Sequence, residues 1–152
     1  MEEYLLMTKI CYKQNGKSKL LKNTNLSVEK IKEDILEYFD LGHCSIELMF
    51  RKKYYGDGKN VLLYIPENEI SISSLNIKFC FGIFLMTCLD SNGELYSFIN
   101  KSSVDNLKEY FIQDEIYYEE ELCFDINVVI EIAIDFVLNK RINLNYFETV
   151  FS

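Results

Sequence analysis

The chain has very little of several residue types, and each shortage excludes a class of protein. It has no tryptophan, one proline and six glycines in 152 residues, so it contains no proline- or glycine-rich linker. Its longest stretch without a charged residue, Phe79 to Leu89, spans 11 residues, whereas a membrane-spanning helix needs about 20. The first residues lack the positive charge and small-residue cleavage site of a secretory signal. We therefore expect one domain, residues 1–152, located in the cytoplasm.

Basic residues are also in deficit. Sixteen Lys and Arg against 24 Asp and Glu give a net charge of −8, which argues against a general nucleic-acid-binding module, because Lys and Arg make most phosphate contacts. The charge is unevenly distributed: residues 1–60 hold 11 basic and 9 acidic residues, and residues 61–152 hold 5 and 15. Eight of the acids lie between Asp105 and Asp125, with Lys108 as the one base among them.

Signatures of enzymes and metal sites are nearly absent. The five cysteines show no closely spaced pair of the zinc or redox kind, which predicts free thiols. His43 is the single histidine, and no motif ties a nucleophile to it, so we expect a structural role. Gly56-Asp57-Gly58 lacks the further glycine and the helix of a phosphate-binding loop. We expect no enzyme activity, cofactor or metal, although paired-carboxylate hydrolysis and a weak cation site at Glu119-Glu120-Glu121 stay open alternatives.

Most of the first hundred residues read as strands. Tyr4 to Tyr12 and Cys44 to Lys53 alternate in the manner of strands, and Asn15-Gly16 suits a tight turn. Further strands are expected at Asn60 to Ile65, after a hairpin loop at residues 54–59, at Leu75 to Leu89, and at Glu94 to Ile99 after the turn at residues 90–93. These strands would form a largely antiparallel sheet in sequential hairpin order.

Two segments follow helical periodicity. The first is an amphipathic helix for which Ser27 can serve as the N-cap. Leu26 and Ile31 can form a hydrophobic staple at its start, and Gly42 would end it. Residues 128–138 are rich in β-branched side chains, but their polar residues recur at every fourth position, as on a largely buried helix; these are Glu131, Asp135 and Asn139. The expected fold is therefore α+β: a largely antiparallel β-sheet with an N-terminal amphipathic helix and a buried C-terminal helix.

The acidic segment, residues 113–121, reads Gln-Asp-Glu-Ile-Tyr-Tyr-Glu-Glu-Glu. It can be a solvated loop or an edge strand whose charge discourages strand pairing. It can also be a binding face for a basic partner, since tyrosine supplies amphipathic contact area and clustered carboxylates steer association.

The last third of the chain resembles a known family. Its segments follow one another in a familiar order. These are an apolar strand after Leu75, the turn at residues 90–93, the segment 109–121, the helix Val129-Ile130-Glu131-Ile132-Ala133-Ile134-Asp135-Phe136 and the pair Lys140-Arg141. This order, over residues 70–150, resembles the bacterial immunity proteins of polymorphic toxin and contact-dependent growth inhibition systems, which include the protector against a double-stranded-DNA cytidine deaminase toxin. Ile142 follows Arg141 where the family usually has proline, and Tyr146 or Phe147 replaces a tryptophan.

The resemblance implies an antitoxin function: tight, stoichiometric inhibition of a toxin domain, often a nuclease or deaminase with a basic cleft. It also implies that Glu131, Ala133 and Phe136 are structural. Combined with the acidic segment, it suggests the residues that meet the toxin; these are Asp114, Glu115, Tyr117, Tyr118, Glu119, Glu120 and Glu121. Three other functions stay open: an acidic nucleic-acid mimic that blocks a host nuclease, a small enzyme built on the carboxylates and His43, and a structural subunit.

Overall fold

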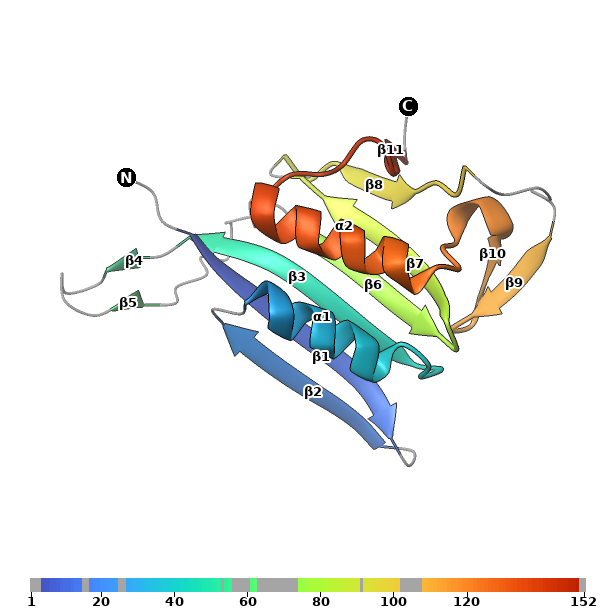
Figure 1. Cartoon of the computed structure of the whole chain (residues 1–152), viewed down its shortest axis with the longest axis horizontal. Helices are drawn as coiled ribbons and strands as arrows, with labels where there is room; N and C mark the ends of the chain where they lie inside the picture. Colours follow the sequence, from blue (N-terminus) through green and yellow to red (C-terminus); the bar gives the residue numbers. More distant parts are fainter. Residues whose placement is uncertain are drawn as a thin grey trace.

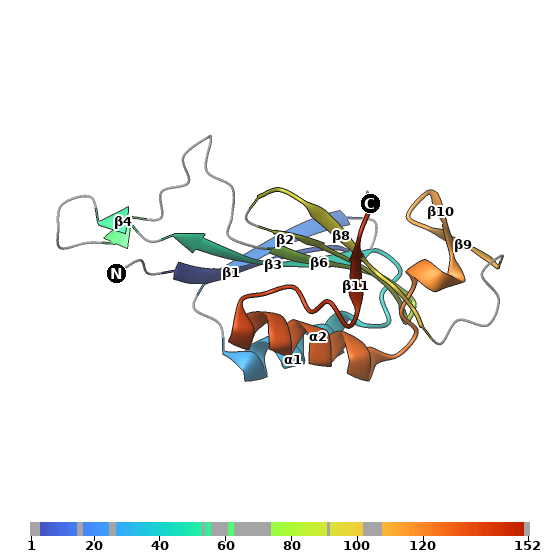
Figure 2. The same cartoon turned by 90° about the horizontal axis from the view of Figure 1, so that it is seen from above.

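The computed structural model describes residues 4–14, 17–24, 27–52, 54–55, 61–62, 74–90, 92–101 and 108–150. Its centre is a seven-stranded sheet in the order β11-β8-β7-β6-β3-β1-β2, in which every neighbouring pair is antiparallel. Two α-helices lie on one face of this sheet, and the described residues place no α-helix on the other face (Figures 1 and 2). The α+β class and the antiparallel sheet are therefore confirmed. No helix in the described ranges is long and apolar enough to cross a membrane.

The N-terminal half supplies one edge of the sheet. β1 (Tyr4–Gln14) pairs with β2 (Lys17–Thr24) on one side and with β3 (Cys44–Lys52) on the other. β2 was not predicted, because its lysine-rich sequence shows no apolar alternation. The predicted turn at Asn15-Gly16 falls outside the described residues, as does Leu26.

The helix between β2 and β3 begins where the sequence predicts but ends before the predicted stop. α1 (Val28–Tyr38) is capped by the Ser27 hydroxyl, which accepts a hydrogen bond from the Lys30 N–H at 3.2 Å. Its Ile31 and Ile35 are buried against the sheet. The helix ends at Tyr38, so Gly42 does not stop it. Gly42 instead makes room for a ring, since a Cβ there would clash with Cζ of Phe81.

The apolar run from Leu75 to Leu89 is two strands, not one. β6 (Ser74–Cys80) and β7 (Ile83–Leu89) form a hairpin closed by Phe81 and Gly82, both of which have positive φ angles, 47° and 83°. This is the geometry of a type I′ turn, which usually carries Asn-Gly. The turn is held from outside, because the Phe81 N–H donates to the Leu41 carbonyl at 2.9 Å and the Gly82 N–H to the Phe39 carbonyl at 3.1 Å.

Sequential hairpin order holds only in part. β3 lies between β1 and β6, and the short strands β4 (Tyr54–Tyr55) and β5 (Val61–Leu62) pair with each other in a separate ladder. The expected strand from Asn60 to Ile65 is thus described only at Val61–Leu62. The turn at residues 90–93 is confirmed: the Asp90 carboxylate accepts from the Asn92 and Glu94 N–H groups, both at 2.9 Å, ahead of β8 (Leu95–Phe98).

The C-terminal helix is buried, as expected. α2 (Ile126–Asn139) is capped by Asp125, whose carboxylate accepts from the Asn127 N–H at 2.9 Å. Its Val129, Ala133 and Phe136 are 2% exposed or less. Lys140 ends the helix in the left-handed conformation, with φ 52°. The structural role predicted for Ala133 and Phe136 is therefore confirmed.

The aromatic tail completes the core. β11 (Phe147–Thr149) pairs with β8, and the Phe147 ring meets the Phe98 ring edge-on with centroids 6.2 Å apart. Burial and a hydrogen bond to Glu131 raise the pKa of Tyr146. The tail thus connects the last strand, the sheet edge and α2.

Candidate functional site

The acidic segment forms most of a hairpin that lies beyond one end of the sheet (Figures 1 and 2). β9 (Glu109–Ile112) pairs with β10 (Glu115–Tyr118), and the 3-10 helix η1 (Glu119–Glu121) follows directly. Gln113 and Asp114 turn the chain with positive φ angles of 48° and 71°. Asp adopts this conformation more readily than most residues, which suits a type I′ turn and fixes the register of the pair.

One face of the hairpin, its inner face, anchors it to the rest of the protein. Ile112 is 1% exposed and Leu122 is fully buried, and both pack with Leu85 of β7 in a cluster separate from the main core. Leu85 alternates with the core residues Phe84 and Met86, so it belongs to the sheet face opposite the helices. The hairpin therefore packs on the end of that face.

Tyr117 belongs to the inner face. It is half-buried, packs against the Ile112–Leu122 cluster and lies opposite Tyr110 in the register. Its hydroxyl donates to Oε2 of Glu115 at 2.6 Å. Burial, with this hydrogen bond, raises the pKa of Tyr117 to about 12. Of the two tyrosines expected as partner anchors, Tyr117 is thus engaged within the hairpin itself.

The raised pKa of Tyr117 predicts a loss of stability at high pH. Because the folded state holds the phenol proton more tightly than the unfolded chain does, the contribution is fully present below the ordinary tyrosine pKa, near 10, and is lost as pH rises to about 12. Urea unfolding from pH 9 to 12 should show a steeper decline for the wild type than for Tyr117→Phe. Identical declines would contradict this role.

The opposite face of the hairpin carries exposed apolar side chains. Phe111 and Ile116 lie directly opposite each other in the register and are 67% and 58% exposed, and Tyr118 on the same face is 42% exposed. We call these three side chains the outer patch. Cross-strand neighbours have Cβ atoms about 5 Å apart, so Phe111 and Ile116 form one continuous apolar surface.

The carboxylates of the hairpin and of η1 differ in how strongly the fold engages them. Asp114, Glu115 and Glu120 are exposed, whereas Glu119 and Glu121 are half-buried. Oε2 of Glu121 accepts from the Tyr118 N–H at 2.9 Å, which ties the 3-10 helix to the end of β10. Glu115 is engaged by Tyr117. Asp114 and Glu120 therefore offer the least constrained charges of the predicted set.

The hairpin is held firmly where it joins α2. Cys123 exchanges two backbone hydrogen bonds with Phe84, both 2.8 Å long, and the Asn100 side chain donates to the Leu122 carbonyl at 3.0 Å. The next residues, Phe124 and Asp125, lead into α2, with the Phe124 ring 5.3 Å from that of Tyr110. The outer patch is consequently presented on a fixed support.

The described residues offer little to enzyme or metal chemistry. Among them, no three His, Cys, Asp or Glu side chains are grouped so that they could hold a metal ion. All five cysteines are free, and burial raises the pKa of Cys44 and Cys88 to about 12 and that of Cys123 to about 11, away from the reactive thiolate form. His43 is exposed on the approach to β3.

The structure thus brings all seven predicted partner-binding residues into one hairpin and its adjoining turn of helix. Sequence reasoning missed Phe111 and did not include Ile116. The available signal was the short alternation in Glu109–Ile112, but alternation alone does not show which face of a strand is covered.

Comparisons with known proteins bear on the fold. The sequence matches no family model and no curated protein. A solved structure described as a hypothetical protein from Neisseria gonorrhoeae is similar, with a TM-score of 0.59 and 16% identity, over 93% of this chain and 91% of that one. At this identity the likeness shows that the two chains share a fold over nearly their whole lengths.

Proposed function

We propose that this protein is an immunity protein that binds a cognate bacterial toxin domain and neutralises it. The toxin would be a nuclease or deaminase, and the hairpin β9–β10 would cover its basic active-site cleft. Such a protein acts in the cytoplasm of the cell that makes both partners. The order of elements over residues 70–150 supports this assignment through the family resemblance.

The observation that carries the proposal is the outer patch. Monomeric proteins expose single apolar side chains everywhere, but paired large ones on a supported hairpin are typical of interfaces. Phe111 and Ile116 still expose more than half of their surfaces, so a partner has that area left to bury. The hairpin combines this apolar centre with a polar rim, which is the usual anatomy of a binding surface.

The acidic rim supports a basic partner. Asp114 at the turn and Glu120 in η1 lie on either side of β10 along the chain and are both exposed. A cleft that binds nucleic acid is basic, so it would attract these carboxylates during the encounter. The apolar centre would then supply affinity that depends on shape.

An acidic nucleic-acid mimic that blocks a host nuclease is the second candidate, and the exposed carboxylates favour it. A mimic relies on charge and would inhibit several unrelated DNA-binding enzymes. An immunity protein relies on the outer patch as well and would inhibit one toxin. Selectivity therefore separates the two functions.

Growth of cells that express the toxin domain of the neighbouring gene tests the proposal. We expect that domain to stop growth when expressed alone and to be tolerated when this protein is co-expressed. Unrelated nuclease toxins should remain lethal in its presence. A harmless neighbour, or protection against every nuclease tested, would contradict the immunity assignment.

A further inference from the structure

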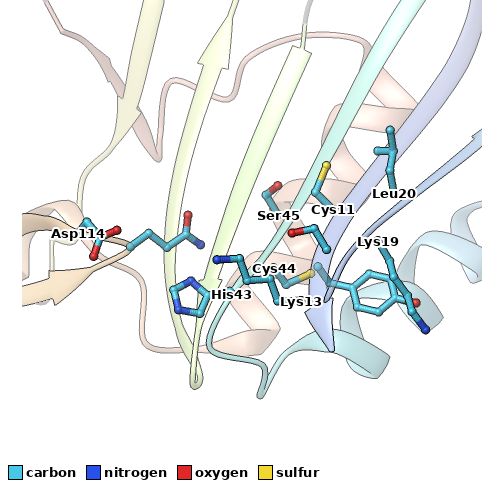
Figure 3. Close-up of a pocket in the computed structure, with 11 residues that line it drawn as sticks. Cys11, Lys13, Lys19, Leu20, His43, Cys44, Ser45 and Asp114 are labelled. Atoms are coloured by element: carbon cyan, nitrogen blue, oxygen red, sulfur yellow. The ribbon is translucent and has the colours of Figure 1, made fainter. Parts of the chain in front are cut away.

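A second surface lies on the helix-free face of the sheet, where the N-terminal strands end near the tip of the hairpin. A pocket of about 450 Å³ opens there, lined by residues of β1, β2, the approach to β3 and the turn Gln113–Asp114. We call it the strand-end pocket. Figure 3 shows Lys13 and Ser45 on the strands and His43 just before β3, with Asp114 across from them on the hairpin.

The sheet register places the floor of this pocket in two cross-strand rows. Lys13 pairs with Ser18 on one side, and its N–H donates to the His43 carbonyl at 3.1 Å on the other. Two residues earlier on β1, Cys11 pairs with Leu20 of β2 on one side and with Ser45 of β3 on the other. Residues two apart on a strand share a face, so the polar row lies beside the row that contains Leu20.

Basic residue types line the pocket, which is unusual for so acidic a protein; these are Lys13, Lys19 and His43. Lys13 and His43 are both exposed, and neither forms an ion pair with another described residue. Lys9, two positions from Cys11 on the same strand and face, does not line the pocket and lies opposite Glu47 of β3 in the register. Asp114 is the one carboxylate-bearing residue that lines the pocket.

We propose that the strand-end pocket binds a small phosphate monoester. The pocket lining offers many hydrogen-bond donors; these are the Lys13 ammonium group, the His43 ring, the Ser18 and Ser45 hydroxyls and the Gln113 amide. They are more donors than the two oxygens of a carboxylate ligand would readily accept. A phosphate monoester offers three strong acceptor oxygens and a negative charge that complements the Lys13 ammonium group. The volume exceeds that of a phosphate group, and Leu20, which is 51% exposed, gives the organic part an apolar wall.

Backbone amide NMR of the full chain, titrated at constant ionic strength with inorganic phosphate, adenosine monophosphate or adenosine, tests this site. Both phosphates should shift the signals of Lys13, His43 and Ser45 saturably, and the monophosphate should also shift that of Leu20. Adenosine should shift none of them. Lys13→Gln combined with His43→Gln should weaken phosphate binding about tenfold or more, since each removes a donor to a charged group.

The matched control is Lys9→Gln, which removes a lysine from the same strand and face outside the pocket and should leave phosphate affinity unchanged. Asp114→Asn should strengthen binding, because it removes a like charge from the pocket wall. Responses to phosphate that do not saturate, equal losses for Lys9→Gln and Lys13→Gln, or shifts caused by adenosine alone would overturn the proposal.

Discussion

Replacing Phe111 and Ile116 together with alanine should weaken binding to the toxin domain about a hundredfold. Full burial of a large apolar side chain contributes about 1.5–3 kcal/mol, and these two have 67% and 58% of their surfaces left to bury. About 1.5 kcal/mol from each gives about 3 kcal/mol, and every 1.4 kcal/mol is about tenfold in affinity. The loss should appear mainly in the dissociation rate, which surface plasmon resonance measures.

The control for this double variant is Leu144→Ala. Leu144 is 70% exposed in the loop after α2, so its truncation also removes exposed apolar area, at a position far along the chain from the hairpin. We expect wild-type affinity for Leu144→Ala. Thermal unfolding should show that both variants remain folded, since exposed positions contribute little to the core. Equal affinities for the wild type and the double variant would place the interface elsewhere, for example on α1.

Changing the free carboxylates should slow association. Asp114→Asn combined with Glu120→Lys makes the net charge three units more positive. Asparagine at position 114 still suits the positive φ of the turn. Electrostatic steering raises association rates about 10- to 1000-fold at low salt, so we expect about a tenfold slower association and a flatter dependence on salt. Stopped-flow mixing at several salt concentrations measures both quantities.

A variant with the same charge change elsewhere distinguishes local steering from net charge. Glu29→Lys with Glu33→Gln alters exposed residues of α1 by the same three units. We expect only a small change in its association rate, because charges beyond a Debye length, about 8 Å at physiological salt, are largely screened. An equal slowing in both variants would mean that the acidic hairpin has no special role. Glu121 is unsuitable for this test because it caps the Tyr118 N–H.

The sequence revealed the helices more fully than the sheet. The Ser27 cap and the fourth-residue stripe of Glu131, Asp135 and Asn139 are local signals, and both helices formed where they predict. The hairpin at Phe81–Gly82 was hidden, because a phenylalanine with positive φ is held there by backbone hydrogen bonds from Phe81 and Gly82 to the carbonyls of Leu41 and Phe39. Such tertiary support leaves no mark in the local sequence.

The same limit applies to the candidate site. Composition alone identified the acidic segment, and all of its predicted residues lie in one hairpin and its adjoining helical turn. The division of that hairpin into an anchored face and an exposed face depends on Leu85, which lies more than twenty positions earlier in the chain and packs against Ile112. Only the packing shows that Tyr117 faces inward while Phe111 and Ile116 face outward.

The most direct test is a titration of the purified toxin domain of the neighbouring gene with this protein, with toxin activity as the readout. We expect activity to fall linearly to zero at one molecule of this protein per toxin domain, and the two chains to elute together in size-exclusion chromatography. The variant with alanine at positions 111 and 116 should require a large excess. Undiminished toxin activity at equimolar protein, with the two chains eluting separately, would contradict the proposed function.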